Sequence, residues 1–211
     1  MSERVFEQAN QHHGVVADAV AALGTALGVV IEAEAITGTG PSADRAAGRR
    51  AKAAALARAG GPPPVEGHEP DGRPRWPAGW SGSVAHGAGW AVVAVIRADR
   101  TVGVDVERAG ALGLEDAALV LDEREREVAA AAPDPAEMAT VIWSAKESAF
   151  KAWSSAAGGL AGVDPVDIHI EVDGARLRAT ATGGLRGQPV LDGARIDAGG
   201  VVVTLLVGAV E

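Results

Sequence analysis

The 211-residue sequence contains no cysteine and no tyrosine, and only 3% of its residues are aromatic. Without cysteine the chain has neither a disulfide framework nor a thiolate zinc site. Few aromatic side chains leave the packing of a core to small aliphatic residues, and the 47% hydrophobic content supplies these. The length suits one domain of good size, or two small halves that share an interface.

The sequence also lacks an excess of positive charge, because 19 basic residues face 28 acidic ones and the formal charge is −9. Neutralisation of phosphates drives nucleic-acid binding, so we expect no nucleic-acid partner. The longest apolar runs, such as AVVAVI and VVVTLLVGAV, are far shorter than the ~20 residues that span a bilayer. The first residues, MSERVFEQANQHHG, contain no apolar run typical of a secretory signal. We therefore expect a soluble, cytoplasmic protein that does not bind membranes.

The pattern of apolar and turn-forming residues predicts a mixed α+β fold. We expect a short helix and then a strand in 15–35, helices at 42–59, 113–132 and 136–156, strands at 90–97 and 101–107, and three more strands in 163–211. Ser42 is a candidate N-cap, and Pro133 is expected to end a helix. The short connection between 90–97 and 101–107 predicts a β-hairpin. The Pro/Gly-rich segment 60–79 cannot form regular structure, and it is too long to be a mere connector.

Two carboxylates share one face of the expected strand 101–107. Valines alternate on one face, and Gly103, Asp105 and Glu107 lie on the other. Because residues two apart on a strand are roughly 6.5–7 Å apart, both carboxylates can reach one ion. A purely oxygen-based site of this kind favours Mg²⁺ or Mn²⁺ over zinc, but it needs a third ligand. A strand with a solvated acidic face is the alternative interpretation.

The segment WSAKESAFKAW, residues 143–153, contains a lysine on the apolar face of an expected helix. At about 100° per residue, Lys146 falls within the arc formed by Ile142, Ala145, Ala149, Phe150 and Trp153. Glu147 supplies a candidate third carboxylate, and Lys151 lies one turn further on. An i,i+4 surface pair explains Glu147 and Lys151, with Lys146 extending to the rim of the face. An anionic ligand would explain the positions of all three residues.

These two motifs together resemble the paired signature of the 4′-phosphopantetheinyl transferases. That signature is roughly G-[IV]-D-x-E followed by [FW]-[SCT]-x-K-E-[AS]-x-x-K. Residues 71–86 resemble the family's G-x-P, W-P-x-G and G-S-x-[ST]-H segments, and 46–60 resembles its arginine-bearing helix. The order of motifs is most similar to the monomeric, double-length class, of the siderophore-synthetase-activator or surfactin type. The resemblance implies a pseudo-twofold α+β fold of two similar subdomains, 1–103 and 104–211, with the active site between them.

The resemblance also implies an activity and its partners. Members of the family transfer 4′-phosphopantetheine from coenzyme A, their substrate, to a serine of an apo acyl, aryl or peptidyl carrier-protein domain. The reaction requires Mg²⁺ and releases adenosine 3′,5′-bisphosphate. The alternative is a non-catalytic relative that binds coenzyme A or a carrier protein. A serine hydrolase is set aside because the serines of SGSVAHG lack the flanking glycines of a nucleophile elbow. A phosphate-binding loop is excluded because G-x-x-x-x-G-K is absent.

By the resemblance, the metal and catalytic roles fall in the second half. Asp105, Glu107 and Glu147 would hold the metal ion, and Glu147 would act as general base, metal ligand or both. Lys146 and Lys151 would contact phosphate oxygens as point charges, and Lys151 would also act in catalysis. A candidate docking surface for the carrier protein is formed by Trp153 and the loop 154–162.

The remaining coenzyme A contacts would come from the first half. His86 matches the histidine that contacts the 3′-phosphate, and Arg49 is the best candidate for a second phosphate contact. Arg45 shares a helix face with Arg49, although a solvated basic stripe is an equal alternative for Arg45. Ser83 and Arg73 match the G-S and G-x-P segments. Ala85 stands where the family has Ser or Thr, and basic residues are missing before the helix at 42–59, which bears on the affinity for coenzyme A.

Overall fold

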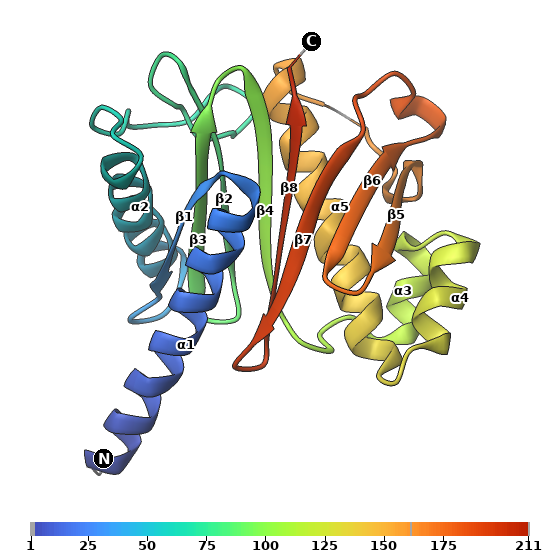
Figure 1. The fold of residues 1–211 in the computed structure, drawn as a ribbon, viewed down its shortest axis with the longest axis horizontal. Coiled ribbons are helices and arrows are strands. Elements are labelled where there is room, and N and C mark those ends of the chain that lie inside the picture. The colour runs from blue at the N-terminus through green and yellow to red at the C-terminus, as the bar shows by residue number, and fades with distance from the viewer. Residues whose placement is uncertain (1–2, 161, 211) are drawn as a thin grey trace.

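The computed structural model describes residues 3–160 and 162–210, and of residues 3–13 only the backbone. Within them the fold is mixed α+β, as the sequence predicts, and it contains two antiparallel sheets (Figure 1). The first sheet has the order β1 (Val30–Ala35), β3 (Trp90–Arg97), β2 (Trp80–Gly87). The second has the order β4 (Arg100–Arg108), β8 (Val201–Ala209), β7 (Leu191–Ala198), β6 (Arg176–Ala181), β5 (Ile168–Asp173).

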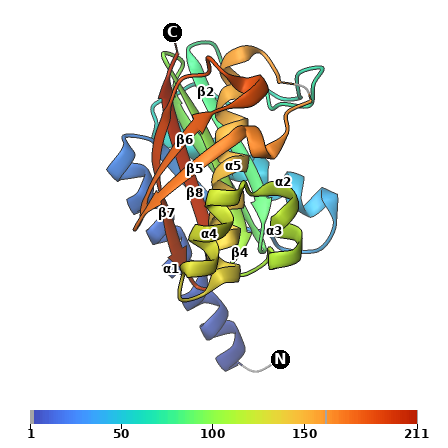
Figure 2. The ribbon, with the colours of Figure 1, turned by 90° about the vertical axis from the view of Figure 1, so that its right-hand side faces the viewer.

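Helices cover both sides of the strands. They are α1 (Glu3–Leu27), α2 (Pro41–Arg58), α3 (Leu114–Val120), α4 (Glu123–Ala131) and α5 (Pro135–Ala157), with 3₁₀ turns at Pro165–Asp167 and Gly183–Leu185. Figure 2 shows α2 and α5 on one side of the strand layer and α1 on the other. Helix α1 contacts β1 of the first sheet and β7 and β8 of the second, so its apolar face joins the two halves.

The strict alternation along β4 puts its valines and its carboxylates on opposite faces. Val102, Val104 and Val106 belong to the core beneath α1, whereas Asp105 faces α5. Gly103, on the same face as Asp105, allows α5 to pass close to the strand, because a Cβ at this position would lie 1.7 Å from the carbonyl oxygen of Ser148. The carboxylates of β4 are therefore placed against the helix that carries Glu147.

Strand β2 lies directly beside β4, although the two strands belong to different sheets. A Cβ at Gly87 would lie 2.1 Å from the carbonyl oxygen of Val106. The Ser83 hydroxyl oxygen accepts a hydrogen bond from the backbone N–H of Val104, 3.1 Å away. Residues of the first half thus stand next to the acidic face of the second.

Some expected elements differ from those in the structure. The predicted hairpin of 90–97 and 101–107 is wrong, because β3 pairs with β1 and β2 on its two edges while β4 pairs with β8. The predicted helix 113–132 is interrupted, since Asp122 caps α4 in a capping box with Glu125. The sequence analysis did not predict β2 or β7 as strands.

Segment 60–79 is irregular, as expected, since it contains no helix or strand and a single bridge joins His68 and Pro74. Helix α2 begins with Pro41 after Gly40, which makes no side-chain cap, so Ser42 lies inside the first turn and is not the N-cap. The expected division into 1–103 and 104–211 stays a prediction; residues 103 and 104 both lie within β4, and the chain passes from one sheet to the other at residues 98–99. Its outer limits, residues 1 and 211, lie outside the described residues.

No helix among the described residues has the length and apolar character required to cross a membrane.

Candidate active site between the two sheets

Asp105 on β4 is the centre of a buried polar cluster. Its side chain is only 6% exposed. Lys151 Nζ lies 2.6 Å from Asp105 Oδ1 and also donates a hydrogen bond to the carbonyl oxygen of Val104 at 3.3 Å. The Ser144 hydroxyl donates to Asp105 Oδ2 at 2.9 Å. Each carboxylate oxygen therefore has a donor, and both donors come from α5.

Two further carboxylates lie within electrostatic reach of this ion pair. Burial raises the pKa of Glu107 above its ordinary value of 4.5, and the negative charges of Asp105 and Glu147 raise it further, while Lys151 lowers it. Burial also raises the pKa of Glu147, where Lys151 acts in the opposite direction and Asp105 adds to the rise. Both pKa values thus respond to burial first and to the charges of Asp105 and Lys151 second, but the ligand atoms of Asp105, Glu107 and Glu147 do not all lie within 4.8 Å of one another.

This donor set fits a hard divalent cation. Carboxylate oxygens are the ligands that Mg²⁺ and Mn²⁺ prefer, and a cation would offset the burial and the repulsion that raise the pKa values of Glu107 and Glu147. The Ser144 hydroxyl lies 2.9 Å from Thr204 Oγ1, and Ser148 Oγ lies 2.8 Å from the same atom. This network holds Asp105 in one orientation. Sequence analysis did not identify Ser144, although its position in the W-S-x-K-E motif was the available signal.

A second group of predicted residues lies around a cavity of about 130 Å³ between α2, β2 and the long loop. Its walls include Arg45, Arg49 and His86. The side chains of both arginines and of the histidine are exposed, and none has a hydrogen bond or ion pair with the described residues. Gly48 leaves room for the histidine ring, because a Cβ there would lie 2.6 Å from His86 Nε2. The cavity is suited to an anionic group.

A second cavity of about 150 Å³ is lined by Lys151. Pro74 and Val84 line both cavities, and Arg73 and Lys151 line the second. Arg73 Nε lies 2.7 Å from Asp71 Oδ2, so its charge is already paired. Lys151 lines this cavity, whereas Glu147 lines a third cavity together with Lys146 and Phe150. Ser83 also lines the cavity at Lys151, and its hydroxyl joins β2 to β4.

Lys146 does not belong to the polar cluster around Asp105. Its ammonium nitrogen lies 2.7 Å from Glu125 Oε2, and both side chains are 1% exposed. It also donates hydrogen bonds to the carbonyl oxygens of Pro165 and Ile168. This position corrects the expectation that Lys146 contacts a phosphate. The lysine lies on the apolar face of α5 because a buried carboxylate from α4 pairs with it there.

Trp153 is also buried, and it is not part of an exposed docking surface. Its side chain is fully buried in the core of the second half, and its indole N–H donates to the carbonyl oxygen of Pro189 at 2.9 Å. This corrects the expectation that Trp153 contacts a carrier protein. Of the loop 154–162, residue 161 lies outside the described residues.

A separate cluster joins Asp122, Glu125 and His169, whose ligand atoms lie within 4.8 Å of one another. Every carboxylate oxygen in it has a donor nearby. Asp122 accepts from the backbone of Glu125 and lies 2.7 Å from His169, and Glu125 accepts from the backbones of Asp122 and Ile170 and from Lys146. The cluster is explained by the helix cap and the buried ion pair. The D-x-x-E spacing was the sequence signal for it.

Two family models match this chain. A model described as the 4′-phosphopantetheinyl transferase superfamily matches residues 101–191. A model of the 4′-phosphopantetheinyl transferase N-terminal domain matches residues 42–96. The acidic cluster lies within the first range, and the basic cavity residues Arg45, Arg49 and His86 lie within the second.

Individual relatives match only part of this chain. The chain is 35% identical over 150 residues to 4′-phosphopantetheinyl transferase Svp of Streptomyces mobaraensis, covering 68% of this chain and 59% of that protein. It is 36% identical over 122 residues to enterobactin synthase component D of Salmonella typhi, covering 52% of this chain and 51% of that protein. The chain thus spans little more than half the length of these curated relatives. A solved holo-[acyl-carrier-protein] synthase from Thermotoga maritima is 20% identical, covers 51% of this chain and 61% of that one, and has a TM-score of 0.41.

Proposed function

Because the chain belongs to the 4′-phosphopantetheinyl transferase superfamily, we propose that it transfers 4′-phosphopantetheine from coenzyme A to a serine of an apo carrier-protein domain. The carrier is an acyl, aryl or peptidyl carrier domain, and adenosine 3′,5′-bisphosphate is the second product. The observation that carries this proposal is the Asp105–Lys151 ion pair with Glu107 and Glu147 in electrostatic reach, at a cavity that shares Pro74 and Val84 with the basic cavity.

Each side chain of the acidic cluster has a distinct part in this reaction. The serine oxygen attacks the β-phosphorus of the pyrophosphate, and the bond from this phosphorus to the bridging oxygen breaks. Glu147 accepts the proton of the serine as general base. Lys151 holds a phosphate oxygen by charge, as phosphoryl transfer depends mainly on positioning and electrostatics. Asp105, Glu107 and Glu147 would hold Mg²⁺ or Mn²⁺, which would neutralise charge on the leaving bisphosphate.

The basic cavity supports the binding of the nucleotide end of coenzyme A. Arg49 and His86 contact the 3′-phosphate, and Arg45 adds charge at the rim. Arg73 lines the cavity that also contains Lys151, and Ser83 keeps β2 and β4 in contact. Lys146 has no phosphate contact in this arrangement, because its charge is paired with Glu125.

The acidic cluster and the basic cavity both come from one chain, which supports activity as a monomer. The monomeric state and the cytoplasmic location stay predictions.

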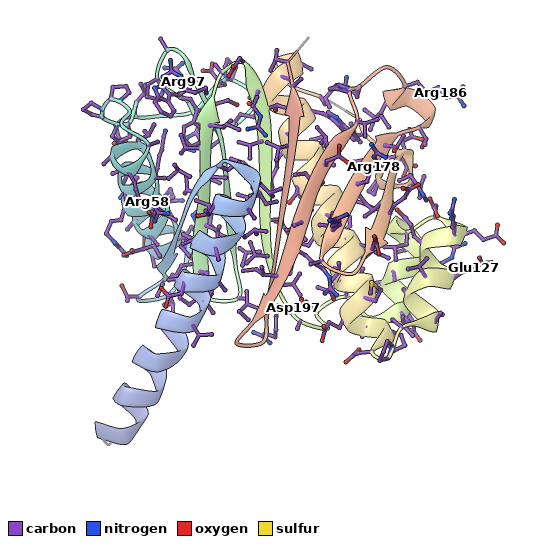
Figure 3. All side chains as sticks on the ribbon, in the orientation of Figure 1. Arg58, Arg97, Glu127, Arg178, Arg186 and Asp197 are labelled. Atoms are coloured by element: carbon purple, nitrogen blue, oxygen red, sulfur yellow. The ribbon has the colours of Figure 1, made fainter. Side chains whose placement is uncertain are left out.

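The test is intact-mass spectrometry of an apo carrier protein after incubation with this protein, coenzyme A and Mg²⁺. A mass gain of one phosphopantetheine is expected with the unmodified protein, and none with Glu147→Gln. Glu127→Gln is the matched control, since this exposed glutamate extends from α4 away from the sheets (Figure 3). No gain on acyl, aryl or peptidyl carriers, with coenzyme A still bound in calorimetry, would favour the non-catalytic relative over the transferase.

A further inference from the structure

Lys52 on α2 is a buried lysine that has no part in the reaction described above. It is only 8% exposed, and no carboxylate among the described residues forms an ion pair with its nitrogen. Burial lowers the pKa of Lys52 below its ordinary value of 10.5, while the charge of Glu66 acts in the opposite direction. A charged group in this position needs close polar partners to offset the loss of water.

The partners of Lys52 come from both arms of the long loop, residues 60–79. Its nitrogen Nζ donates one hydrogen bond to the carbonyl oxygen of Val65 at 2.9 Å and another to the carbonyl oxygen of Arg75 at 2.5 Å. The same nitrogen lies over the ring of Trp76, 4.7 Å from its centroid, where an ammonium group is attracted to the aromatic face. Lys52 therefore joins the outgoing arm of the loop to the returning arm.

The stretch between these two attachments forms part of the wall of both cavities. Residues 64–68 line the basic cavity, Arg73 lines the second cavity, and Pro74 lines both. The ion pair of Glu69 and Arg75 within this stretch is 3.5 Å long and exposed to solvent, so it contributes little to the order of the loop. The bonds of Lys52 are instead shielded from water, and they fix this wall to α2.

We propose that Lys52 is a positioning residue that holds residues 65–75 as a common wall of the two cavities, in the form that binds coenzyme A. The inference rests on the proposed function. Lys52 acts on the loop and not on the ligand, because its hydrogen bonds are directed to Val65 and Arg75. Without them the loop opens locally, as segments with few buried contacts do, while the domain stays folded. The apparent affinity then falls with the fraction of molecules that have an ordered wall.

The experiment measures the order of the loop and the affinity for ligands in the same variants of the full chain. Trypsin can cut the chain after Arg75, and the carbonyl oxygen that Lys52 holds belongs to the bond that is cut. In Lys52→Met, intact-mass spectrometry is expected to show this cut at least about tenfold faster, because charge-assisted hydrogen bonds to the loop are lost. Calorimetry is expected to show coenzyme A and dephospho-coenzyme A weakened by the same factor, about threefold to tenfold. The urea midpoint of the domain is expected to be nearly unchanged.

Two matched variants accompany Lys52→Met. An arginine can donate to both carbonyl oxygens and stack on the ring of Trp76, so Lys52→Arg is expected to restore the slow cut and most of the affinity. Arg50→Met removes an exposed cation from the same helix, where it pairs with Glu34. This control is expected to leave both the cut and the affinities unchanged.

The outcomes separate this inference from the proposed function. An unchanged cut after Arg75 in Lys52→Met would overturn the inference, as would a faster cut with unchanged affinity. A greater loss for coenzyme A than for dephospho-coenzyme A would show that Lys52 contacts the 3′-phosphate itself. A lower urea midpoint with faster cuts throughout the chain would reduce Lys52 to a general stabilising residue. If the unmodified protein binds neither ligand, the proposed function fails and the affinity part of the inference fails with it, whereas the trypsin comparison still decides whether Lys52 orders the loop.

Discussion

Replacing Lys146 by methionine is expected to destabilise the protein strongly without altering its affinity for coenzyme A. The substitution leaves Glu125, which is 1% exposed, as a buried carboxylate without its cation. Glu125 keeps the backbone donors of Asp122 and Ile170, each 2.8 Å away, and the His169 ring nitrogen 3.9 Å from its Oε1. The carbonyl oxygens of Pro165 and Ile168 lose the ammonium group as well.

The magnitude follows from the burial of both partners. Removing one member of a buried ion pair typically costs about 3–5 kcal/mol, out of a total stability of about 5–15 kcal/mol. Glu125→Gln removes the negative charge but can keep hydrogen bonds. The double variant is therefore expected to lose less stability than the two single variants together, with a coupling of about 0.5–3 kcal/mol.

The assay is urea denaturation of the four proteins in the cycle, with coenzyme A calorimetry below the transition. Arg124→Met, which removes an exposed cation from α4, is the control and should stay within about 0.5 kcal/mol of the unmodified protein. A loss below about 1 kcal/mol in Lys146→Met, or strictly additive losses, would refute the assignment of a buried ion pair. A folded variant with selectively weakened coenzyme A binding would show instead that Lys146 reaches the ligand.

Three further outcomes are expected. The raised pKa of Glu107 means that the folded state holds its proton more tightly than the unfolded state, so in chelator the free energy of unfolding falls as pH rises from about 4.5 through the folded pKa. Glu107→Gln removes this fall, so the melting temperature of the variant is expected to rise relative to that of the unmodified protein as pH increases. A relative melting temperature that falls with rising pH would contradict this account. Trp153→Ala is expected to cost about 3–5 kcal/mol in urea unfolding; a fully stable variant with weakened carrier binding would restore the docking interpretation. Arg49→Ala is expected to weaken coenzyme A more than dephospho-coenzyme A, and equal effects in calorimetry would remove Arg49 from the 3′-phosphate.

The sequence predicted the strand face of Asp105 and Glu107 and the helix that carries Glu147, because both depend on local periodicity. Alternation along 101–107 places Asp105 and Glu107 on one face of a strand, and β4 has this arrangement. The spacing of Glu147 and Lys151 on one helix is likewise local, and α5 covers the expected range. That these elements face each other follows from Gly103, whose missing side chain lets α5 approach the strand.

Features that depend on distant partners could not be derived in the same way. The short connection between β3 and β4 indicates a hairpin, but both edges of β3 are occupied by other strands. Lys146 was recognised as an anomaly on an apolar face, yet its partner Glu125 lies on another helix. The same holds for Trp153, whose burial depends on packing against the sheet and on the carbonyl of Pro189.

The central claim is that the acidic cluster transfers phosphopantetheine, and the most direct test counts both products of one reaction. Adenosine 3′,5′-bisphosphate released from coenzyme A and holo-carrier formed are measured together by liquid chromatography and mass spectrometry. We predict a one-to-one ratio that requires Mg²⁺ or Mn²⁺ and is lost in Glu147→Gln. Release of the bisphosphate without modification of the carrier, or full transfer by Glu147→Gln, would contradict the account.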